Sequence, residues 1–352
     1  MTPRTPPQRV YVTDCEGPLS RNDNAQELAA HFIPGGTGFF ARLSRYDDLL
    51  ADVLHRPGYN AGDTLRLLAP FLVAYGATDH AVEQYSADNV VLVPGAGRML
   101  PALAKLLPTF IISTSYTPYI RALCRLTGFP FENCRCTEIS LDSWTLDADQ
   151  VELLREAAAR ISARPQITIK PGAQRVDDLS RQDAAAVAEL DHLFWDKLQG
   201  TASARLMESV RPVGGEMKLA ALQEIVTQMG CAGRDVMYVG DSITDAPTLA
   251  AVRAWGGVAL SFNGNGYALA AAEFAAASPD AGVAAELAKA FAGGGRDGVG
   301  AAVRAWPTSK EGEKPTRAGA RVGLVAEEPE ALAEASSAAR RSMRGERIAH
   351  LG

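Results

Sequence analysis

The sequence contains few cysteines, and their spacing does not match that of a disulfide framework or a zinc site. There are five, an odd number, and they form no C-x-x-C pair: Cys15, Cys124, Cys134, Cys136 and Cys231. Zinc sites and redox pairs depend on such paired spacing. We therefore expect reduced thiols, as in a cytoplasmic protein.

The sequence also lacks an excess of positive charge and any long apolar run. Its 35 Lys and Arg residues are outnumbered by 41 Asp and Glu residues, which gives a formal net charge of -6. Proteins that bind nucleic acid usually carry a basic patch or stripe, and a membrane-spanning helix needs about 18 or more consecutive apolar residues. We therefore expect neither a nucleic-acid partner nor a membrane segment.

The pattern of apolar residues indicates an α/β fold. Four short apolar runs are candidate strands: Val10–Thr13, Phe110–Ser113, Val236–Val239 and Val258–Phe262. Helix-like stretches rich in Ala, Leu and Arg separate them, which is typical of a mainly parallel sheet. Ligands of such sheets bind beyond the carboxyl ends of the strands, so reactive side chains are expected there.

Two long intervals between the strands have helical patterning. The first separates the first two strands by about 95 residues, far more than a normal connection needs. Residues 21–90 are therefore predicted to form a mainly helical cap inserted into the sheet domain. Residues 137–211 form a possible second helical insertion, and the core then comprises residues 9–20 and 91–292.

The C-terminal part differs in composition from the rest. Residues 293–320 include GGGRDGVG and PTSKEGEKPTRAG, which are rich in Gly, Pro and charge and predict a flexible linker. Residues 321–352 are predicted to form a tail with a short strand and a short helix that begins near Glu330. Because every reactive candidate lies upstream, we expect the residues after about 293 to be dispensable for the chemistry.

Two carboxylates follow the first candidate strand. The run VYVTDCEGPLS places Asp14 and Glu16 at the strand end, before a Gly17-Pro18 turn. One carboxylate can attack phosphorus to form an aspartyl-phosphate, while the other protonates the leaving oxygen and then activates water. Two solvated acids would give the same short pattern, so the interpretation depends on further elements.

Hydroxyl groups follow the second candidate strand. The run TFIISTSY ends in three of them, of which Ser113 is the first candidate and Thr114 the alternative. A hydroxyl beside free backbone N–H groups can hold a phosphoryl oxygen. A turn or a helix cap would explain the same residues without a ligand.

A lysine and two further acids complete the pattern. In GGEMKLAAL, Lys218 can offset the charges of an attacking carboxylate and a phosphate. The run VMYVGDSITDAPTL places Asp241 and Asp245 in a tight loop after a strand. Because Mg²⁺ prefers carboxylate oxygens, Asp14, Glu16, Asp241 and Asp245 are expected to line a magnesium site. Asp245 has two alternatives: it orients a water or Lys218, or it is only a helix N-cap.

Taken in order, these four elements resemble those of the haloacid dehalogenase superfamily, over roughly residues 9 to 292. The resemblance implies a Rossmann-like core, a mobile cap and magnesium. It also implies that Asp14 is the nucleophile, that Ser113 binds the phosphoryl group and that Lys218 balances charge. By the same resemblance, Asp241 and Asp245 form the metal loop.

The sequence departs from the commonest pattern of this superfamily at one position. Most of its phosphatases have Asp as the acid and base, where this sequence has Glu16, although the enolase-phosphatase branch is similar in having D-x-E-G. Glutamate offers the same chemistry with one more methylene, at an ordinary pKa only about 0.4 higher. The substitution therefore leaves the interpretation intact.

The predicted function is that of a magnesium-dependent phosphoric monoester hydrolase acting on a phosphorylated small molecule through an aspartyl-phosphate. A phosphotransferase of the same fold is one alternative, and a non-catalytic regulatory subunit is another. For the latter, DCEGPLSRNDNAQELAAHFIP and SRYDDLL resemble a branch known in methanogenic archaea as a subunit of an energy-converting hydrogenase, which would imply a protein partner. The sequence predicts neither the substrate nor the oligomeric state.

Overall fold

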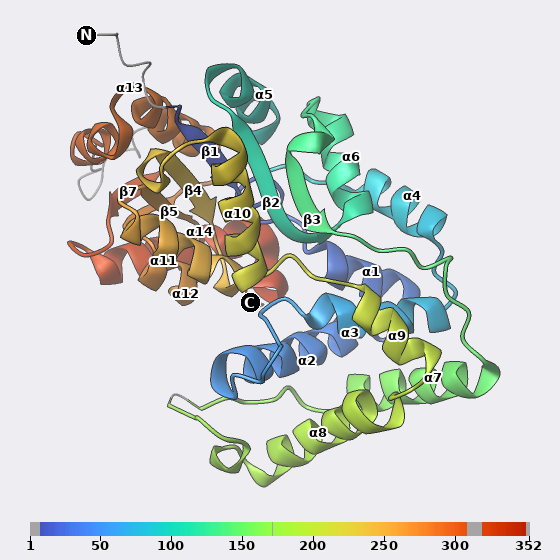
Figure 1. The fold of residues 1–352 in the computed structure, drawn as a ribbon. Coiled ribbons are helices and arrows are strands. Elements are labelled where there is room, and N and C mark those ends of the chain that lie inside the picture. The colour runs from blue at the N-terminus through green and yellow to red at the C-terminus, as the bar shows by residue number, and fades with distance from the viewer. Residues whose placement is uncertain (1–7, 171, 308–318, 350–352) are drawn as a thin grey trace.

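A seven-stranded sheet forms the centre of the molecule in the computed structural model, which describes residues 8–170, 172–307 and 319–349 (Figure 1). The strand order is β3-β2-β1-β4-β5-β6-β7. Neighbouring strands are parallel except for β7, which is antiparallel to β6. The strands are β1 (Val10–Thr13), β2 (Thr109–Tyr116), β3 (Cys134–Thr137), β4 (Val236–Gly240), β5 (Val258–Phe262), β6 (Phe274–Ala277) and β7 (Arg321–Leu324). The predicted α/β fold with a mainly parallel sheet is confirmed.

Helices cover both faces of this sheet. On one face lie α5 (Ala96–Leu106), α6 (Thr117–Thr127) and α13 (Gly282–Arg304), and on the other lie α10 (Glu216–Met229), α11 (Ala246–Ala254) and α12 (Gly266–Ala271). Because successive side chains of a strand point to opposite faces, Tyr11 packs in the first layer whereas Val10 and Val12 pack in the second. The strands are thus buried on both sides, which explains their continuous apolar runs.

A separate helical body packs beside the sheet (Figure 1). Its helices share one hydrophobic cluster and are α1 (Asn24–Phe32), α2 (Gly36–Asp48), α3 (Thr64–Ala74), α4 (Asp79–Asn89), α7 (Ala148–Ala163), α8 (Arg181–Asp191) and α9 (Ala202–Ser209). They come from both long intervals, 21–90 and 137–211. The two intervals therefore form one body, because each supplies apolar side chains that the other covers.

The linker predicted for residues 293–320 is wrong over its first part. Helix α13 continues through these glycines to Arg304, with a non-helical residue at Gly295 (φ 60°). Glycine disfavours helix, but Phe291, Val299 and Val303 on either side are buried against the sheet, and this burial outweighs the propensity. Residues 308–318 of the predicted linker lie outside the described residues.

The tail predicted for residues 321–352 holds the expected strand, but its helix is not short. Helix α14 (Pro329–Ala349) begins one residue before the predicted start and spans 21 residues, with a non-helical residue at Gly345 (φ 76°). Leu332 is fully buried against Leu269 and Ala275, and Met343 packs in the same cluster as β6. The tail is therefore an integral layer of the fold.

All five cysteines are free thiols. Cys124 Sγ and Cys134 Sγ lie 3.5 Å apart. Among the described helices, none has both the length and the apolar character that a membrane span needs.

Candidate active site

The carboxyl ends of β1, β2 and β4 meet at one edge of the sheet. Asp14 directly follows β1, and its backbone N–H donates to Val239 O of β4 at 2.8 Å. Strand β1 lies between β2 and β4. From β1 the chain adds β2 and β3 on one side of the sheet and β4 to β7 on the other, so the strand order reverses at β1. Parallel sheets bind ligands at such a switch point, and there the structure brings together Asp14, Ser113 and Asp241.

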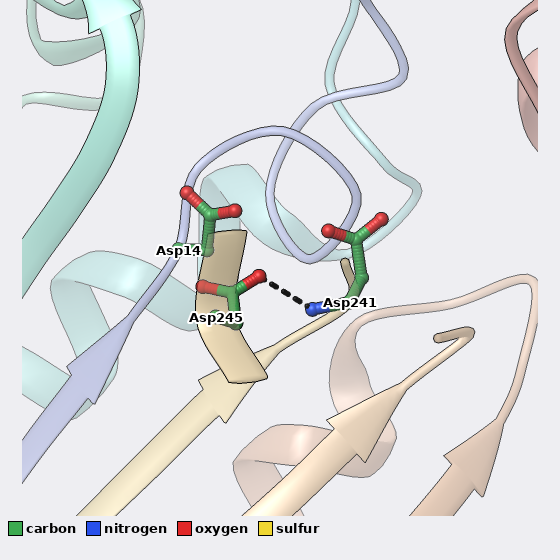
Figure 2. A group of neighbouring side chains, drawn as sticks. All are labelled: Asp14, Asp241 and Asp245. Atoms are coloured by element: carbon green, nitrogen blue, oxygen red, sulfur yellow. Dashed lines mark hydrogen bonds between the residues drawn. The ribbon is translucent and has the colours of Figure 1, made fainter. Parts of the chain in front are cut away.

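Three buried acids converge at this edge (Figure 2). Each of Asp14, Asp241 and Asp245 offers a carboxylate oxygen, and these atoms lie within 4.8 Å of one another. The three residues are 4%, 1% and 0% exposed, so their charges need partners. Glu16 lies outside this group; its Oε1 accepts a hydrogen bond from Asn24 N at 2.8 Å. The structure thus brings together three of the four acids expected to line a metal site.

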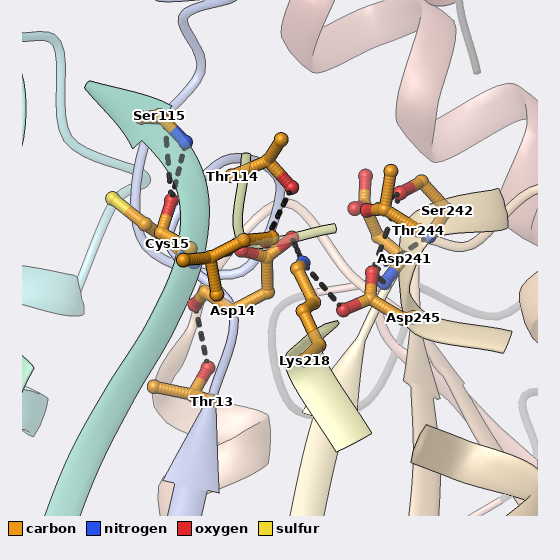
Figure 3. A network of polar contacts seen from close by, with 12 residues as sticks. Thr13, Asp14, Cys15, Thr114, Ser115, Lys218, Asp241, Ser242, Thr244 and Asp245 are labelled. Carbon is orange, nitrogen blue, oxygen red and sulfur yellow. Dashed lines mark hydrogen bonds and ion pairs between the residues drawn. The ribbon is translucent and has the colours of Figure 1, made fainter. Parts of the chain in front are cut away.

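Lys218 lies between two of these acids (Figure 3). Its Nζ is 2.9 Å from Asp14 Oδ2 and 2.7 Å from Asp245 Oδ1, and the side chain is fully buried. Helix α10 starts at a sharp bend, where Gly215 (φ 51°, ψ −124°) donates from its N–H to Thr244 O. Burial alone would lower the pKa of Lys218, but Asp14 and Asp245 outweigh it and raise that pKa. The lysine is therefore a permanent positive charge beside Asp14.

Asp245 positions its neighbours. Its Oδ1 accepts from Lys218 Nζ and from Tyr238 Oη at 2.7 Å each, and its Oδ2 accepts from the N–H groups of Asp241 and Ser242. Burial alone would raise the pKa of Asp245, but Lys218 and these hydrogen bonds hold it below its usual range. Although Asp245 occupies the N-cap position of α11, its side chain makes no capping hydrogen bond there. Its bond from Ser242 N instead completes a capping box of the short helix Ile243–Asp245. Asp245 therefore orients Lys218 and also caps this short helix.

The loop after β1 passes directly against Asp241. Gly17 has a φ of +102°, and a Cβ at this position would lie 2.3 Å from Asp241 Oδ2. A left-handed backbone this close to a side chain requires glycine. The same loop orients Asp14, since Cys15 N donates to Asp14 Oδ1 at 2.7 Å.

The two carboxylates of the first loop have altered proton affinities. Burial, and secondly the charge of Asp23, raise the pKa of Glu16 to about 8, although Arg344 opposes this. Burial and Asp245 also raise the pKa of Asp14, against the effect of Lys218. The raised pKa favours the protonated form of Glu16 at neutral pH, which is the state required of a general acid. Asp14, in contrast, contacts the charged Lys218, which favours its carboxylate form.

The hydroxyl groups at the end of β2 line the same pocket. Ser113 Oγ accepts from Ser115 N and donates to Ser115 Oγ, at 3.2 Å each. Thr114 Oγ1 instead donates to Val213 O at 3.0 Å. Ser115 was not among the predicted site residues, although alternation along the strand places it on the side of Ser113.

The pocket is a cavity of about 110 Å³ between the sheet edge, the helical body and α14. Helix α2 contributes Phe40, Ser44, Asp47 and Asp48 to its wall. Drug-sized ligands usually occupy about 300–1,000 Å³, so this cavity suits a group of only a few atoms.

Helix α14 contributes two arginines that the sequence analysis missed. Arg340 Nη1 hydrogen-bonds to Asp241 Oδ2, and Arg344 Nη1 lies 3.2 Å from the same oxygen. Both side chains line the pocket. The premise that all site residues lie upstream of about 293 is therefore wrong, because the tail reaches the site. Whether these residues are dispensable for the chemistry stays a prediction.

Replacement of the buried lysine should destabilise the protein strongly. Lys218→Met leaves Asp14 and Asp245 buried without their shared counter-charge, and breaking a buried ion pair costs about 3–5 kcal/mol. Urea unfolding in the presence of EDTA would measure this loss. Lys289→Met, which changes an exposed lysine of α13, is the matched control and should alter stability by less than about 0.5 kcal/mol. Equal stability of the two variants would contradict the ion-pair geometry.

No protein-family model matches the chain, and no curated protein sequence matches it. Solved structures do match. Gene product AF1437 from Archaeoglobus fulgidus is 28% identical, with a TM-score of 0.83, over 98% of this chain and 99% of that chain.

Two structures of phosphoserine phosphatase match less of the chain. The apo form is 11% identical with a TM-score of 0.43, over 75% of this chain and 91% of that one. A phospho-aspartyl intermediate analogue is 12% identical with a TM-score of 0.44, over 76% of this chain and 91% of that chain. These values are too low to bear on function. The similarity to the archaeal gene product, in contrast, extends over nearly the whole chain and so includes the helical body and α14.

Proposed function

We propose that this protein is a magnesium-dependent phosphohydrolase of the haloacid dehalogenase type, which acts on a phosphorylated small molecule through an aspartyl-phosphate. One observation carries the proposal. The Asp14 carboxylate lies against the buried Lys218, within 4.8 Å of Asp241 and Asp245, in a pocket at the carboxyl ends of parallel strands. A buried nucleophile with an adjacent permanent cation suits attack on a phosphate dianion.

In the first step, an oxygen of Asp14 forms a bond to phosphorus while the bond from phosphorus to the ester oxygen breaks. Glu16 donates its proton to that leaving oxygen. The hydrogen bond from Cys15 N and the contact with Lys218 hold the Asp14 carboxylate in one orientation. Such fixed orientation lowers the entropic cost of the attack.

In the second step, Glu16, now a carboxylate, takes a proton from water, and the water oxygen attacks phosphorus. The bond from phosphorus to Asp14 breaks, which releases inorganic phosphate and regenerates both side chains. Lys218 offsets the negative charge on Asp14 and on the phosphoryl group throughout. Ser113 is our candidate for a hydroxyl contact with a phosphoryl oxygen, and Thr114 is the second candidate.

The residues present fit Mg²⁺, because the donor set consists of carboxylate oxygens, which this ion prefers. Asp14 and Asp241 would hold it, since one Asp241 oxygen points toward Asp14 (Figure 2). Each oxygen of Asp245 already accepts at least two hydrogen bonds, so we assign Asp245 a positioning role. When bound, the ion would supply positive charge that stabilises the phosphoryl group during transfer.

The helical body would act as the cap that encloses the leaving group. Residues of α2 already form one wall of the pocket, and the cavity is small. A substrate larger than its phosphoryl group would therefore need the helical body to move away from the sheet. Such opening and closing is common in enzymes that exclude water.

A screen of phosphorylated metabolites tests this proposal. Purified protein with MgCl₂ should release inorganic phosphate from one or more of them, and from p-nitrophenyl phosphate at a lower rate. EDTA should stop the release, and excess MgCl₂ should restore it. Transfer to an added alcohol instead of water would indicate a phosphotransferase. No turnover of any ester, by folded protein with MgCl₂, would contradict the proposal.

A further inference from the structure

Helix α14 carries two cations into the pocket from the far end of the chain. Arg340 and Arg344 are four residues apart and therefore lie on one face of the helix. Their side chains are only 4% and 6% exposed. Leu332 and Met343 fix the helix against the sheet, so the position of both guanidinium groups is set by packing.

Both guanidinium groups contact the same atom, Oδ2 of Asp241. Arg344 also donates from Nη2 to Asn22 O at 2.6 Å. Its buried Nε, however, has no hydrogen-bond partner among the residues that the structure describes. Two buried cations thus share the Asp241 carboxylate, and the nearby Asp23 also attracts both of them. One of the two, Arg344, retains an unused donor beside the pocket.

This arrangement would compete with a divalent cation at Asp241. A cation held by Asp14 and Asp241 would add two positive charges next to Arg340, Arg344 and Lys218. At the low effective dielectric of a buried site, like charges at such distances repel strongly. An anion bound among them would remove the repulsion, and a phosphoryl group is such an anion. Guanidinium groups bind phosphate oxygens well because their N–H donors form a planar fork.

We propose that Arg340 and Arg344 are anion-binding residues of the active site, which pair with Asp241 until a divalent cation takes that carboxylate and then bind the phosphoryl oxygens. This inference rests on the proposed function, because it assumes that Mg²⁺ and a phosphate ester occupy the same pocket. It assigns the C-terminal helix a direct part in substrate binding. The ligand class that fits is a phosphate, because its several oxygens can accept hydrogen bonds from both guanidinium groups.

The consequence is that Mg²⁺ and the phosphate anion should bind cooperatively. Isothermal titration calorimetry of EDTA-stripped, dialysed protein with MgCl₂, with and without inorganic phosphate, measures this coupling. In the wild type, phosphate should tighten Mg²⁺ binding by at least about fivefold, and Mg²⁺ should tighten phosphate binding by the same factor. If the wild type shows no such coupling, the inference is wrong.

Variants of Arg340 and Arg344 distinguish a role in anion binding from a role in folding alone. Arg344→Gln removes a competing charge, so Mg²⁺ alone should bind more tightly, while the effect of phosphate should fall toward none. Arg340→Gln should act in the same direction. Arg344→Lys retains the charge and should keep the affinity for Mg²⁺ alone near the wild-type value. The lysine variant also guards against loss of folding in the glutamine variants.

Arg341→Gln is the matched control, because Arg341 is exposed on the same helix and donates to Ser337 Oγ. It should titrate like the wild type. An Arg344→Gln protein with unchanged affinity for Mg²⁺ and unchanged phosphate coupling would overturn the inference. If the coupling is present but no phosphate ester is hydrolysed, the proposed function fails and the anion-binding role stands.

Discussion

Asp14→Asn should reduce the rate of phosphate release below about 1% of the wild-type rate, because the nucleophile of a covalent mechanism has no substitute. The amide of asparagine does not attack phosphorus here. The substitution also removes one anionic ligand of Mg²⁺. Lys218 keeps its contact with Asp245 Oδ1, so the loop should retain its structure. Circular dichroism and a continuous phosphate assay would measure fold and rate on the same preparation.

Asp149→Asn is a suitable control for this variant, because Asp149 is exposed on α7. It should retain the full rate. Mass spectrometry should exclude deamidation of the introduced amide back to aspartate, which would restore activity slowly. An Asp14→Asn protein that is intact and turns over at more than a few per cent of the wild-type rate would rule out Asp14 as the nucleophile.

Glu16→Gln should separate the two chemical steps. The substitution preserves size but removes the proton donor and acceptor, and loss of such catalysis typically costs about 100- to 10,000-fold. With p-nitrophenyl phosphate the leaving group needs little acid help, so Asp14 should still become phosphorylated. Hydrolysis of the aspartyl-phosphate needs the base and should become slow. A burst of p-nitrophenol near one equivalent per enzyme, followed by a slow steady state, is the expected stopped-flow result.

With an alkyl phosphate, whose leaving group is poor, both steps of the Glu16→Gln enzyme should slow and the burst should disappear. Glu152→Gln, an exposed position on α7, is the control and should match the wild type with both esters. If the Glu16→Gln enzyme hydrolyses both esters at the wild-type rate, Glu16 is only structural and another group transfers the proton.

The pH dependence gives a second test of Glu16. Burial raises its pKa to about 8, so the proton is present below that pH and is lost as the pH rises through it. For an alkyl phosphate, which needs the acid, kcat/KM should therefore fall as the pH rises above about 8. The Glu16→Gln enzyme should lack this decrease. A wild-type profile with the same shape above pH 8 as the Glu16→Gln profile would contradict the role of Glu16 as the acid.

The position of several side chains at the strand ends could be predicted from the sequence because it depends on local patterns. A buried apolar run followed by polar residues marks the end of a parallel strand, and the carboxyl ends of neighbouring parallel strands share one edge. That reasoning places Asp14 and Asp241 together, and the structure does the same. Strands β1 and β5 also have their predicted bounds.

Other elements could not be predicted, because distant contacts decide them. Arg340 and Arg344 reach Asp241 across 99 and 103 residues of sequence, and a helical pattern does not say which pocket its polar face meets. The FAAA run of β6 was missed because alanine does not favour strands. Neighbouring strands β5 and β7 pair with it on both sides, and this pairing defines it as a strand.

The helical body illustrates the same limit. Residues 21–90 and 137–211 each have helical periodicity, but periodicity within a segment does not show that two segments share a core. The structure joins them through buried side chains such as Phe71 of α3 and Phe194, whose rings lie 6.1 Å apart. Only the three-dimensional packing reveals a single body.

Chemical trapping of the covalent intermediate tests the central claim most directly. Wild-type and Glu16→Gln proteins would be mixed with substrate and MgCl₂, quenched in acid and reduced with borohydride, which converts an aspartyl-phosphate to homoserine. Peptide mass spectrometry should then find homoserine at position 14, in larger amount in the Glu16→Gln protein, and none when EDTA is present or in the Asp14→Asn protein. Phosphate release without homoserine at position 14, or with homoserine at another aspartate, would contradict the account.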